Sequence, residues 1–123
     1  MRYARLYADP AGETHFTDVD AELRELVDFP PPAGPLLVSA PAPATAWVLL
    51  RAPSGWDSDW HPAPRRQLVV PVAGKIEVEV SDGERRQFGS GDLCLLEDTS
   101  GRGHRTRILG EQGAAFVMVR LPE

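Results

Sequence analysis

The sequence predicts an all-β protein in which short strands form an antiparallel sandwich or barrel. Apolar and charged residues alternate with a period of two from Lys75 to Val80, as expected when one face of a strand is buried. The next residues, Ser81-Asp82-Gly83, supply the Asp-Gly signal of a tight hairpin. Further short apolar runs separated by glycine-containing turns continue toward the end of the chain, which is typical of sandwiches and barrels.

The expected strands follow one another from Trp47 onward. The first is a short apolar run, and the second ends at Ala73-Gly74. The third is the alternating segment, and the others are separated by turns that contain glycine. Together the predicted strands are 47–50, 67–72, 75–80, 85–88, 93–96, 104–109 and 115–121.

The residues before Trp47 predict a different kind of structure. Residues 29–44 hold six of the twelve prolines, which cannot donate to a sheet ladder and so exclude a central strand. We expect an extended, polyproline-like arm that lies across the barrel or a partner subunit. A linker to a separate domain is the alternative, but the 28 residues before the arm are too few for an independent core.

The structure of residues 17–28 stays open. Apolar residues fall at helical spacing after Thr17, a possible helix cap, and these are Val19, Leu23, Leu26 and Val27. A short edge strand over 14–19 is equally compatible with the pattern.

Composition limits the number of domains and the classes of partner. A chain of 123 residues with 42% apolar content suits one domain, with residues 1–46 packed as strand and arm on a barrel of residues 47–123. The net charge of −5 and the pI of about 5.2 disfavour nucleic acid and membrane surfaces. No apolar run suits a signal peptide or a membrane span, so we expect a cytoplasmic protein. Cys94 lies in an apolar run and is expected to be a buried, unreactive thiol.

Two stretches, from Gly55 to Gly74 and from Gly91 to His104, resemble the two glycine-bounded motifs of the cupins. The first is Gly55-x5-His61-x-Ala63-x3-Gln67-x6-Gly74. The second begins at Gly91-Asp92 and ends at His104, although the usual Pro-x-Gly-x-x-His ending is replaced by residues 98–104. Gly101-Arg102-Gly103 supplies a flexible bend before His104. The resemblance covers residues 47–121.

The resemblance implies a double-stranded β-helix, or jelly-roll, barrel that is commonly dimeric and holds a small-molecule or metal site inside one end. In the family, two histidines and a glutamate of the first motif and one histidine of the second bind a divalent metal. Carried over by position, the first and last histidines are His61 and His104. The second histidine is replaced by Ala63, which has no donor atom, and the glutamate by Gln67. His61, Gln67 and His104 are therefore the candidate ligands for Zn, Ni, Fe or Mn.

The same three side chains are also candidates for metal-free chemistry. Family geometry directs His61, Gln67 and His104 toward one interior, where imidazoles serve as acids or bases near neutral pH and an amide can orient a carbonyl. This favours an isomerase, cyclase, dehydratase or lyase acting on a small organic molecule, ahead of a metal-dependent dioxygenase. The alternatives are a non-catalytic protein that binds a metabolite or assists a partner enzyme, and histidines that only remain from an ancestral site.

Four further residues are candidates for a substrate pocket. Trp56 and Trp60 flank the approach to His61 and suggest an aromatic lip, or else packing against the proline arm. Arg65 can reach an anionic substrate, although only one of Arg65 and Arg66 can point inward because neighbouring strand residues face opposite sides. His15 either folds over the mouth of the pocket or is an ordinary exposed histidine.

Overall fold

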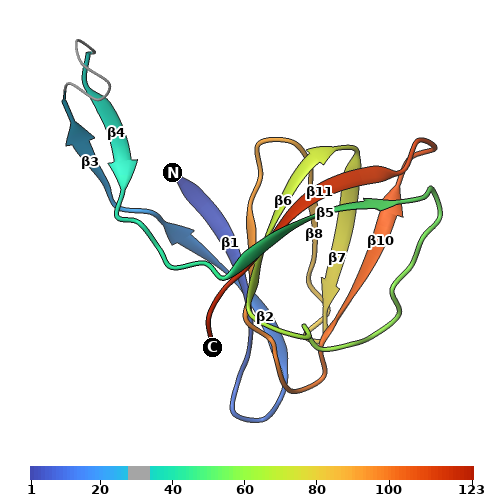
Figure 1. Cartoon of the computed structure of the whole chain (residues 1–123). Coiled ribbons are helices and arrows are strands. Elements are labelled where there is room, and N and C mark those ends of the chain that lie inside the picture. The colour runs from blue at the N-terminus through green and yellow to red at the C-terminus, as the bar shows by residue number, and fades with distance from the viewer. Residues whose placement is uncertain (28–33) are drawn as a thin grey trace.

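The computed structural model describes residues 1–27 and 34–123, and every regular element in these residues is a strand (Figure 1). The strands are β1 (Arg2–Ala8), β2 (Thr14–Asp20), β3 (Leu23–Leu26), β4 (Leu36–Ser39), β5 (Ala46–Ala52), β6 (Gln67–Ala73), β7 (Lys75–Val80), β8 (Arg85–Phe88), β9 (Cys94–Leu96), β10 (His104–Leu109) and β11 (Ala114–Arg120). Within the described part of the chain, no helix has the length and apolar character needed to cross a membrane.

Two sheets enclose the core. One has six strands in the order β2-β1-β9-β6-β11-β5, and the other has three in the order β10-β7-β8. The core between them is formed by alternate residues of facing strands, such as Leu6, Val69, Val78, Phe88 and Phe116, all at most 6% exposed. This arrangement confirms the predicted all-β jelly-roll fold, because side chains that alternate along each strand can fill a single interior.

The seven strands expected after residue 46 are present with ends shifted by at most two residues. The Asp-Gly hairpin joins β7 to β8, and its Gly83 has a φ of 100°. Gly74, at φ 74°, separates β6 from β7 where a Cβ atom would lie 2.3 Å from the carbonyl oxygen of Gly113. Only glycine fits this position, since both the backbone angle and the available space exclude a side chain.

The N-terminal residues differ in part from the prediction. Residues 14–20 form a strand, because Thr14 and Phe16 point into the core with the period of two. β1 lies inside the six-stranded sheet, antiparallel to β2 and parallel to β9. β1 and β2 are therefore components of the barrel wall and are not an addition packed onto it.

The expected proline arm is also differently placed. Residues 29–33 lie outside the described residues, while Leu36–Ser39 form β4 and pair with β3. This strand is free of proline, so its backbone can complete a ladder. The β3–β4 hairpin stands off the barrel (Figure 1), and all four residues of β4 are exposed. In the isolated chain the hairpin is not packed on the barrel.

Candidate active site

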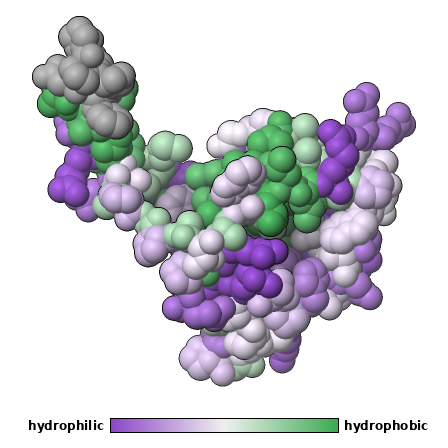
Figure 2. Space-filling model, viewed as in Figure 1, coloured by the Kyte–Doolittle hydropathy of each residue, from purple (hydrophilic) through white to green (hydrophobic). Residues whose placement is uncertain are grey.

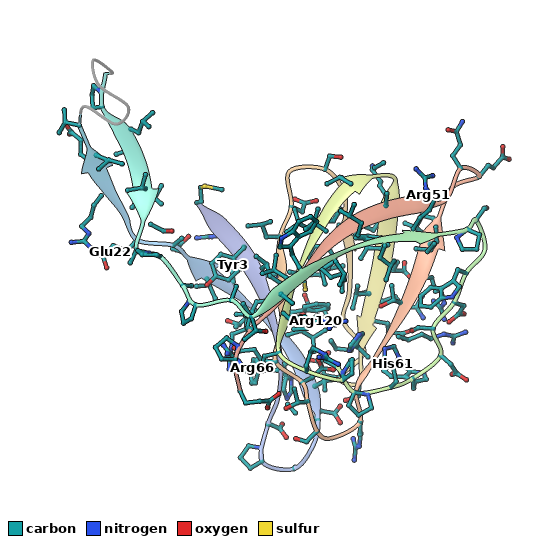
Figure 3. The ribbon with its side chains drawn as sticks, in the orientation of Figure 1. Tyr3, Glu22, Arg51, His61, Arg66 and Arg120 are labelled. Atoms are coloured by element: carbon teal, nitrogen blue, oxygen red, sulfur yellow. The ribbon has the colours of Figure 1, made fainter. Side chains whose placement is uncertain are left out.

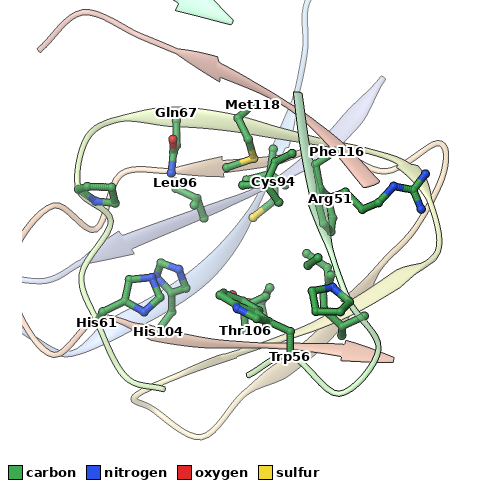
Figure 4. Close-up of a pocket in the computed structure, with 18 residues that line it drawn as sticks. Arg51, Trp56, His61, Gln67, Cys94, Leu96, His104, Thr106, Phe116 and Met118 are labelled. Carbon is green, nitrogen blue, oxygen red and sulfur yellow. The ribbon is translucent and has the colours of Figure 1, made fainter. Parts of the chain in front are cut away.

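A cavity of about 350 Å³ lies between the two sheets at one end of the barrel (Figure 4). Its wall is mostly apolar, with side chains from β6, β7, β9, β10 and β11. They include Val69, Val78, Leu96, Ile108, Phe116 and Met118. The polar groups on the wall are few and include His61, Gln67, His104 and Thr106. A mostly apolar hollow with a small number of polar groups is typical of a small-molecule site.

His61 and His104 lie side by side because their backbones pair. The amide nitrogen of each residue lies 3.0 Å from the carbonyl oxygen of the other, in an isolated antiparallel bridge. Residues paired in this way project their side chains to the same side. Their ring centroids are 4.8 Å apart, with the rings tilted by 51°. The structure thus brings together two imidazoles that are distant in the sequence.

Gly103 permits this close approach. A Cβ atom at this position would lie 2.2 Å from the carbonyl carbon of His61 and 2.5 Å from the nitrogen of Pro62. Its φ of 75° also favours glycine. The glycine predicted to bend the chain before His104 therefore also admits the segment that carries His61.

Asp98 holds the ring of His104. Its Oδ2 lies 2.6 Å from Nδ1 of His104, and the aspartate is fully buried. A carboxylate only accepts, so Nδ1–H of His104 donates to it. Nε2 of His104 has no hydrogen-bond partner among the described residues and is the ring nitrogen left for chemistry in the cavity. Oδ1 of Asp98 is buried and has no hydrogen-bond partner among residues 1–27 and 34–123.

His61 is held in a similar way by the backbone. Its Nδ1 lies 3.0 Å from the carbonyl oxygen of Asp59, a non-glycine residue with a φ of 59°. Because a carbonyl oxygen only accepts, Nδ1–H of His61 donates to it. Both imidazoles therefore use Nδ1 for positioning, which leaves Nε2 of each ring to exchange protons with a ligand.

The segment that carries His61 is also fixed to β10 by charge. Asp57 receives a forked pair of hydrogen bonds from Arg105, with Nε to Oδ1 at 2.9 Å. This guanidinium holds the pKa of the Asp57 carboxyl far below its usual value. Asp57 also forms a backbone bridge with Arg107. The loop between β5 and β6 is therefore fixed to β10 at two points.

Gln67 and Trp56 also line the cavity. Gln67 is the first residue of β6, and Figure 4 shows its amide pointing into the cavity from the wall opposite the two imidazoles. Trp56 lies at the mouth and is 44% exposed. Thr106 follows His104 by two residues on β10 and so shares its face.

The other candidates are not at the cavity. Trp60 is 42% exposed and Arg65 is exposed, and neither contributes to the cavity wall. Arg66 points elsewhere as well, because its Nε lies 2.8 Å from a carboxylate oxygen of Glu97. The expected roles of Trp60 and Arg65 at a substrate pocket therefore lack the necessary contact.

His15 lies between two carboxylates on the outside of the barrel. Its ring nitrogens lie 2.8 Å from Asp9 and 2.8 Å from Asp82. Two hydrogen bonds raise the pKa of His15; the one to Asp9 has the larger effect and the one to Asp82 the smaller. The residue connects the turn after β1 with the turn after β7, and it does not fold over the cavity.

Cys94 lines the cavity with its sulfur (Figure 4). Burial, with a further contribution from Asp98, raises the pKa of the Cys94 thiol to about 12. The thiol is therefore protonated near neutral pH, which agrees with the predicted unreactive cysteine.

Asp98 was missed by sequence reasoning. It belongs to the stretch that replaces the usual ending of the second motif, six residues before His104. The signal that could have identified Asp98 is its acidic side chain two residues after the apolar strand β9, with only Glu97 between them. Its hydrogen bond depends on how the loop returns to β10, which no local pattern specifies.

Comparison with known proteins places the fold. No family model matches the chain, and no curated protein matches it in sequence. Among solved structures, a Cupin 2 conserved barrel domain protein of Salinispora arenicola shares 21% identity over 84% of this chain and 78% of that one, with a TM-score of 0.51. A cupin domain protein of Bordetella pertussis shares 18% identity over 85% and 98%, with a TM-score of 0.50.

A predicted oxalate decarboxylase of Thermotoga maritima is similar at 14% identity, covering 84% of this chain and 95% of that one with a TM-score of 0.50. At these identities the likeness establishes the fold alone. The chain is a cupin-fold protein, as the two motifs in its sequence indicated.

The residues of this site do not fit the metal that the resemblance implies. Ala63 is 2% exposed and packs in the hydrophobic core, so its position offers no ligand. Gln67 provides a neutral amide where a carboxylate would offset the charge of the metal. Within residues 1–27 and 34–123, no group of three or more His, Cys, Asp or Glu side chains is placed to hold a metal ion. Two imidazoles and an amide fall short of the usual donor set.

We therefore expect metal content well below one ion per chain. Protein purified without a histidine tag, then incubated with Zn, Ni, Fe or Mn and desalted, should give less than about 0.1 ion per chain by elemental analysis, because too few anionic or imidazole donors converge. A His61→Ala variant treated identically provides the background from adventitious binding. Stoichiometric metal that disappears in this variant would show that the donor-set argument is wrong.

Proposed function

We propose that this protein is an enzyme that moves a proton within a small, mostly apolar carbonyl compound bound between the two sheets. The observation that carries the proposal is the Asp98–His104 pair beside His61, at the polar end of an apolar cavity. A buried carboxylate behind an imidazole fixes the tautomer and the orientation of the ring. This arrangement supports general base catalysis by Nε2 of His104.

The proposed step is an isomerisation through an enol. Nε2 of His104 takes a proton from the carbon next to a carbonyl, the C–H electron pair forms a carbon–carbon double bond, and the carbonyl electrons move to oxygen. The amide N–H of Gln67 donates to that oxygen. The substrate must carry a carbon–carbon double bond between the second and third carbons from the carbonyl. The proton then returns from the imidazole pair to the third carbon, the double bond shifts next to the carbonyl and the carbonyl reforms, so the step requires no external reactant. The ring of His61, whose centroid lies 4.8 Å from that of His104, is the second imidazole in this proposed transfer.

The lining supports a neutral, ring-bearing substrate with one oxygen function. The cavity volume of about 350 Å³ is at the small end of the range for ligand sites, about 300–1,000 Å³. Arg51 lies at the rim, and Figure 4 shows its guanidinium directed away from the cavity. The aromatic and aliphatic wall, including Trp56 and Phe116, suits a flat hydrocarbon ring.

Deuterium exchange provides a test that does not require knowledge of the natural substrate. The protein is incubated in D₂O near neutral pH with cyclohex-2-enone, isophorone, 1-tetralone and 4-chromanone, and NMR follows loss of the protons next to each carbonyl. We expect exchange above the buffer rate for at least one ketone. His104→Gln should reduce it by about 10²- to 10⁴-fold, the usual contribution of a general base.

Binding measured on the same panel separates the two functional classes. Ligand-observed NMR is recorded for the wild type and for a Trp60→Phe variant, which changes an aromatic residue outside the cavity and should bind and exchange normally. Saturable binding of a ketone without exchange would contradict catalysis and indicate a metabolite-binding protein. Ketone exchange that persists in His104→Gln would show that another residue acts as the general base.

A further inference from the structure

The turn between β1 and β2 closes the end of the barrel that holds the two imidazoles. Figure 3 shows His61 at this end, and the carbonyl oxygen of Gly12 in the turn accepts a hydrogen bond of 2.9 Å from the amide of Arg102. The two segments are in backbone contact, because a Cβ atom at Gly101 would lie 2.6 Å from the same oxygen. The turn therefore packs on the loop that leads to His104.

Thr14 links this turn to the residue before His104. It is fully buried, and its Oγ1 donates to the carbonyl oxygen of Gly103 at 2.7 Å. The same Oγ1 accepts from the amide of Ser81 at 2.8 Å, and the amide of Thr14 donates to Oγ of Ser81 at 2.8 Å. One buried side chain thus joins β2, the turn between β7 and β8, and Gly103, the glycine that lies against the backbone of His61.

His15 holds the same two turns together from outside. Its Nε2 lies 2.8 Å from Oδ2 of Asp9 in the first turn, and its Nδ1 lies 2.8 Å from Oδ2 of Asp82 in the second. A carboxylate only accepts, so both contacts are hydrogen bonds only when both ring nitrogens carry a proton and the ring is positively charged. A neutral ring would turn a nitrogen lone pair toward one of the carboxylates. The contact between the turns therefore depends on the charge of His15.

The surroundings of His15 are polar. The titratable and charged side chains on the elements around it are Arg5 and Tyr7 of β1, Asp9 and Glu13 of the first turn, Asp82 and Glu84 of the second, and Arg102 of the loop before β10. The ring centroid of Tyr7 lies 5.6 Å from that of His15, and Arg102 pairs with Glu13. In the view of Figure 2, polar and neutral residues cover this end of the molecule, whereas apolar residues gather over the strands above it.

The contact between the two turns is complete at acidic pH. Asp9 and Asp82 raise the pKa of His15 above its ordinary value of 6.5. Because the pKa is raised in the folded chain, the charged ring stabilises the fold below the ordinary value, and this stabilisation is lost as the pH rises through the raised value. We therefore expect the two turns to loosen once His15 has lost its proton.

We propose that Thr14 and His15 are positioning residues for the two imidazoles of the cavity. The charged ring of His15 holds the two turns together, and Thr14 transmits their position to Gly103 and from there to His104. When His15 loses its proton, one turn is released and the hydrogen bond from Thr14 no longer fixes Gly103. The effect on ketone exchange rests on the proposed proton transfer, whereas the position of His104 is measurable in the substrate-free protein.

A pH titration of the substrate-free protein, followed by NMR, tests the coupling. The ring signals of the three histidines and the amide signal of Gly103 are followed from about pH 5 to about pH 10. We expect the amide of Gly103 to shift with the same midpoint as the ring of His15, and His15→Gln to remove this transition. Asp9→Asn should lower both midpoints together. A Gly103 amide that does not follow His15, or that keeps the transition in His15→Gln, would overturn the proposal.

Two variants of Thr14 separate the hydrogen bond from packing. Thr14→Val keeps the shape of threonine without its hydroxyl, so His15 should still titrate while the amide of Gly103 stops following it. Cross-relaxation between the rings of His61 and His104 should weaken in the same variant. Thr14→Ser keeps the hydroxyl and should restore both signals. A Thr14→Ser protein that loses the coupling, or a folded Thr14→Val protein that keeps it, would show that Thr14 does not position Gly103.

Ketone exchange measured against pH separates this proposal from the proposed function. In the wild type we expect exchange to fall by about 10- to 100-fold as the pH rises through the midpoint of His15, since a small displacement of a catalytic group has a cost of this order. His15→Gln should lack this step, and Glu13→Gln, which removes the contact with Arg102 in the same turn, should keep it. A wild type that exchanges ketones without the step would overturn the role of His15. If no ketone exchanges, the proposed function fails and the NMR titration still decides the role of His15.

Discussion

Asp98→Ala is expected to lower the free energy of unfolding by about 3 kcal/mol and to abolish the ketone deuterium exchange that depends on His104. The substitution leaves Nδ1–H of a buried imidazole without its acceptor, and a hydrogen bond to a charged group contributes about 1.5–3 kcal/mol. The residue is fully buried and its contact with His104 is 2.6 Å long, so water cannot simply replace the carboxylate. Urea unfolding monitored by tryptophan fluorescence measures the loss.

Asp98→Asn separates positioning from folding. The amide has the shape of the carboxylate, and its NH₂ group can donate to Nδ1, which would place the proton of the neutral imidazole on Nε2. We expect a folded protein in which ketone exchange falls by about 10²- to 10⁴-fold. The ¹⁵N shifts of His104 should report the other tautomer. If Asp98 had only a structural role, an Asp98→Asn protein of unchanged stability would keep both the tautomer of His104 and the rate of ketone exchange.

Glu97→Gln is the control for Asp98. Glu97 precedes it in the chain and contacts Arg5 and Arg66 away from the cavity. Loss of these ion pairs should change stability modestly and leave ketone exchange intact. If Asp98→Asn behaves like Glu97→Gln in both measurements, the assigned role of Asp98 is wrong.

Gly103→Ala should destabilise the protein by about 3 kcal/mol or more and separate the two imidazoles. A φ of 75° costs an alanine on the order of 1–2 kcal/mol. The added Cβ would also lie 2.2 Å from a backbone atom of His61, so one of the two chain segments must move. We expect weaker cross-relaxation between the rings of His61 and His104 in NMR spectra, together with reduced ketone exchange.

Gly110→Ala isolates the contribution of the contact. Gly110 has a φ of 79°, yet a Cβ atom there would meet nothing within 4 Å. This variant should show only the backbone cost, on the order of 1–2 kcal/mol, with the imidazole pair unchanged. Equal losses of stability in the two variants would mean that the contact between Gly103 and His61 is unimportant.

Much of the barrel could be predicted because its signals are local. The alternation in β7 and the Asp-Gly turn to β8 depend only on neighbouring residues, and both are present in the structure. Residues 17–28 could not be assigned, since their apolar spacing suits either a helix or a strand. Burial of Phe16 against distant strands decides in favour of a strand at 14–20.

The sequence by itself determined the strand order in the chain, the cupin motifs and three polar residues of the cavity wall, His61, Gln67 and His104. The tertiary structure alone decided that Asp98 supports His104, that Trp56 lines the cavity while Trp60 does not, and that the hairpin stands away from the barrel. The physical reason is the range of the interactions. Alternation and turn chemistry act between residues that are close in the chain. The path of a loop back to the sheet, the close contact of two backbone segments and the burial of a side chain depend on strands that meet only after folding.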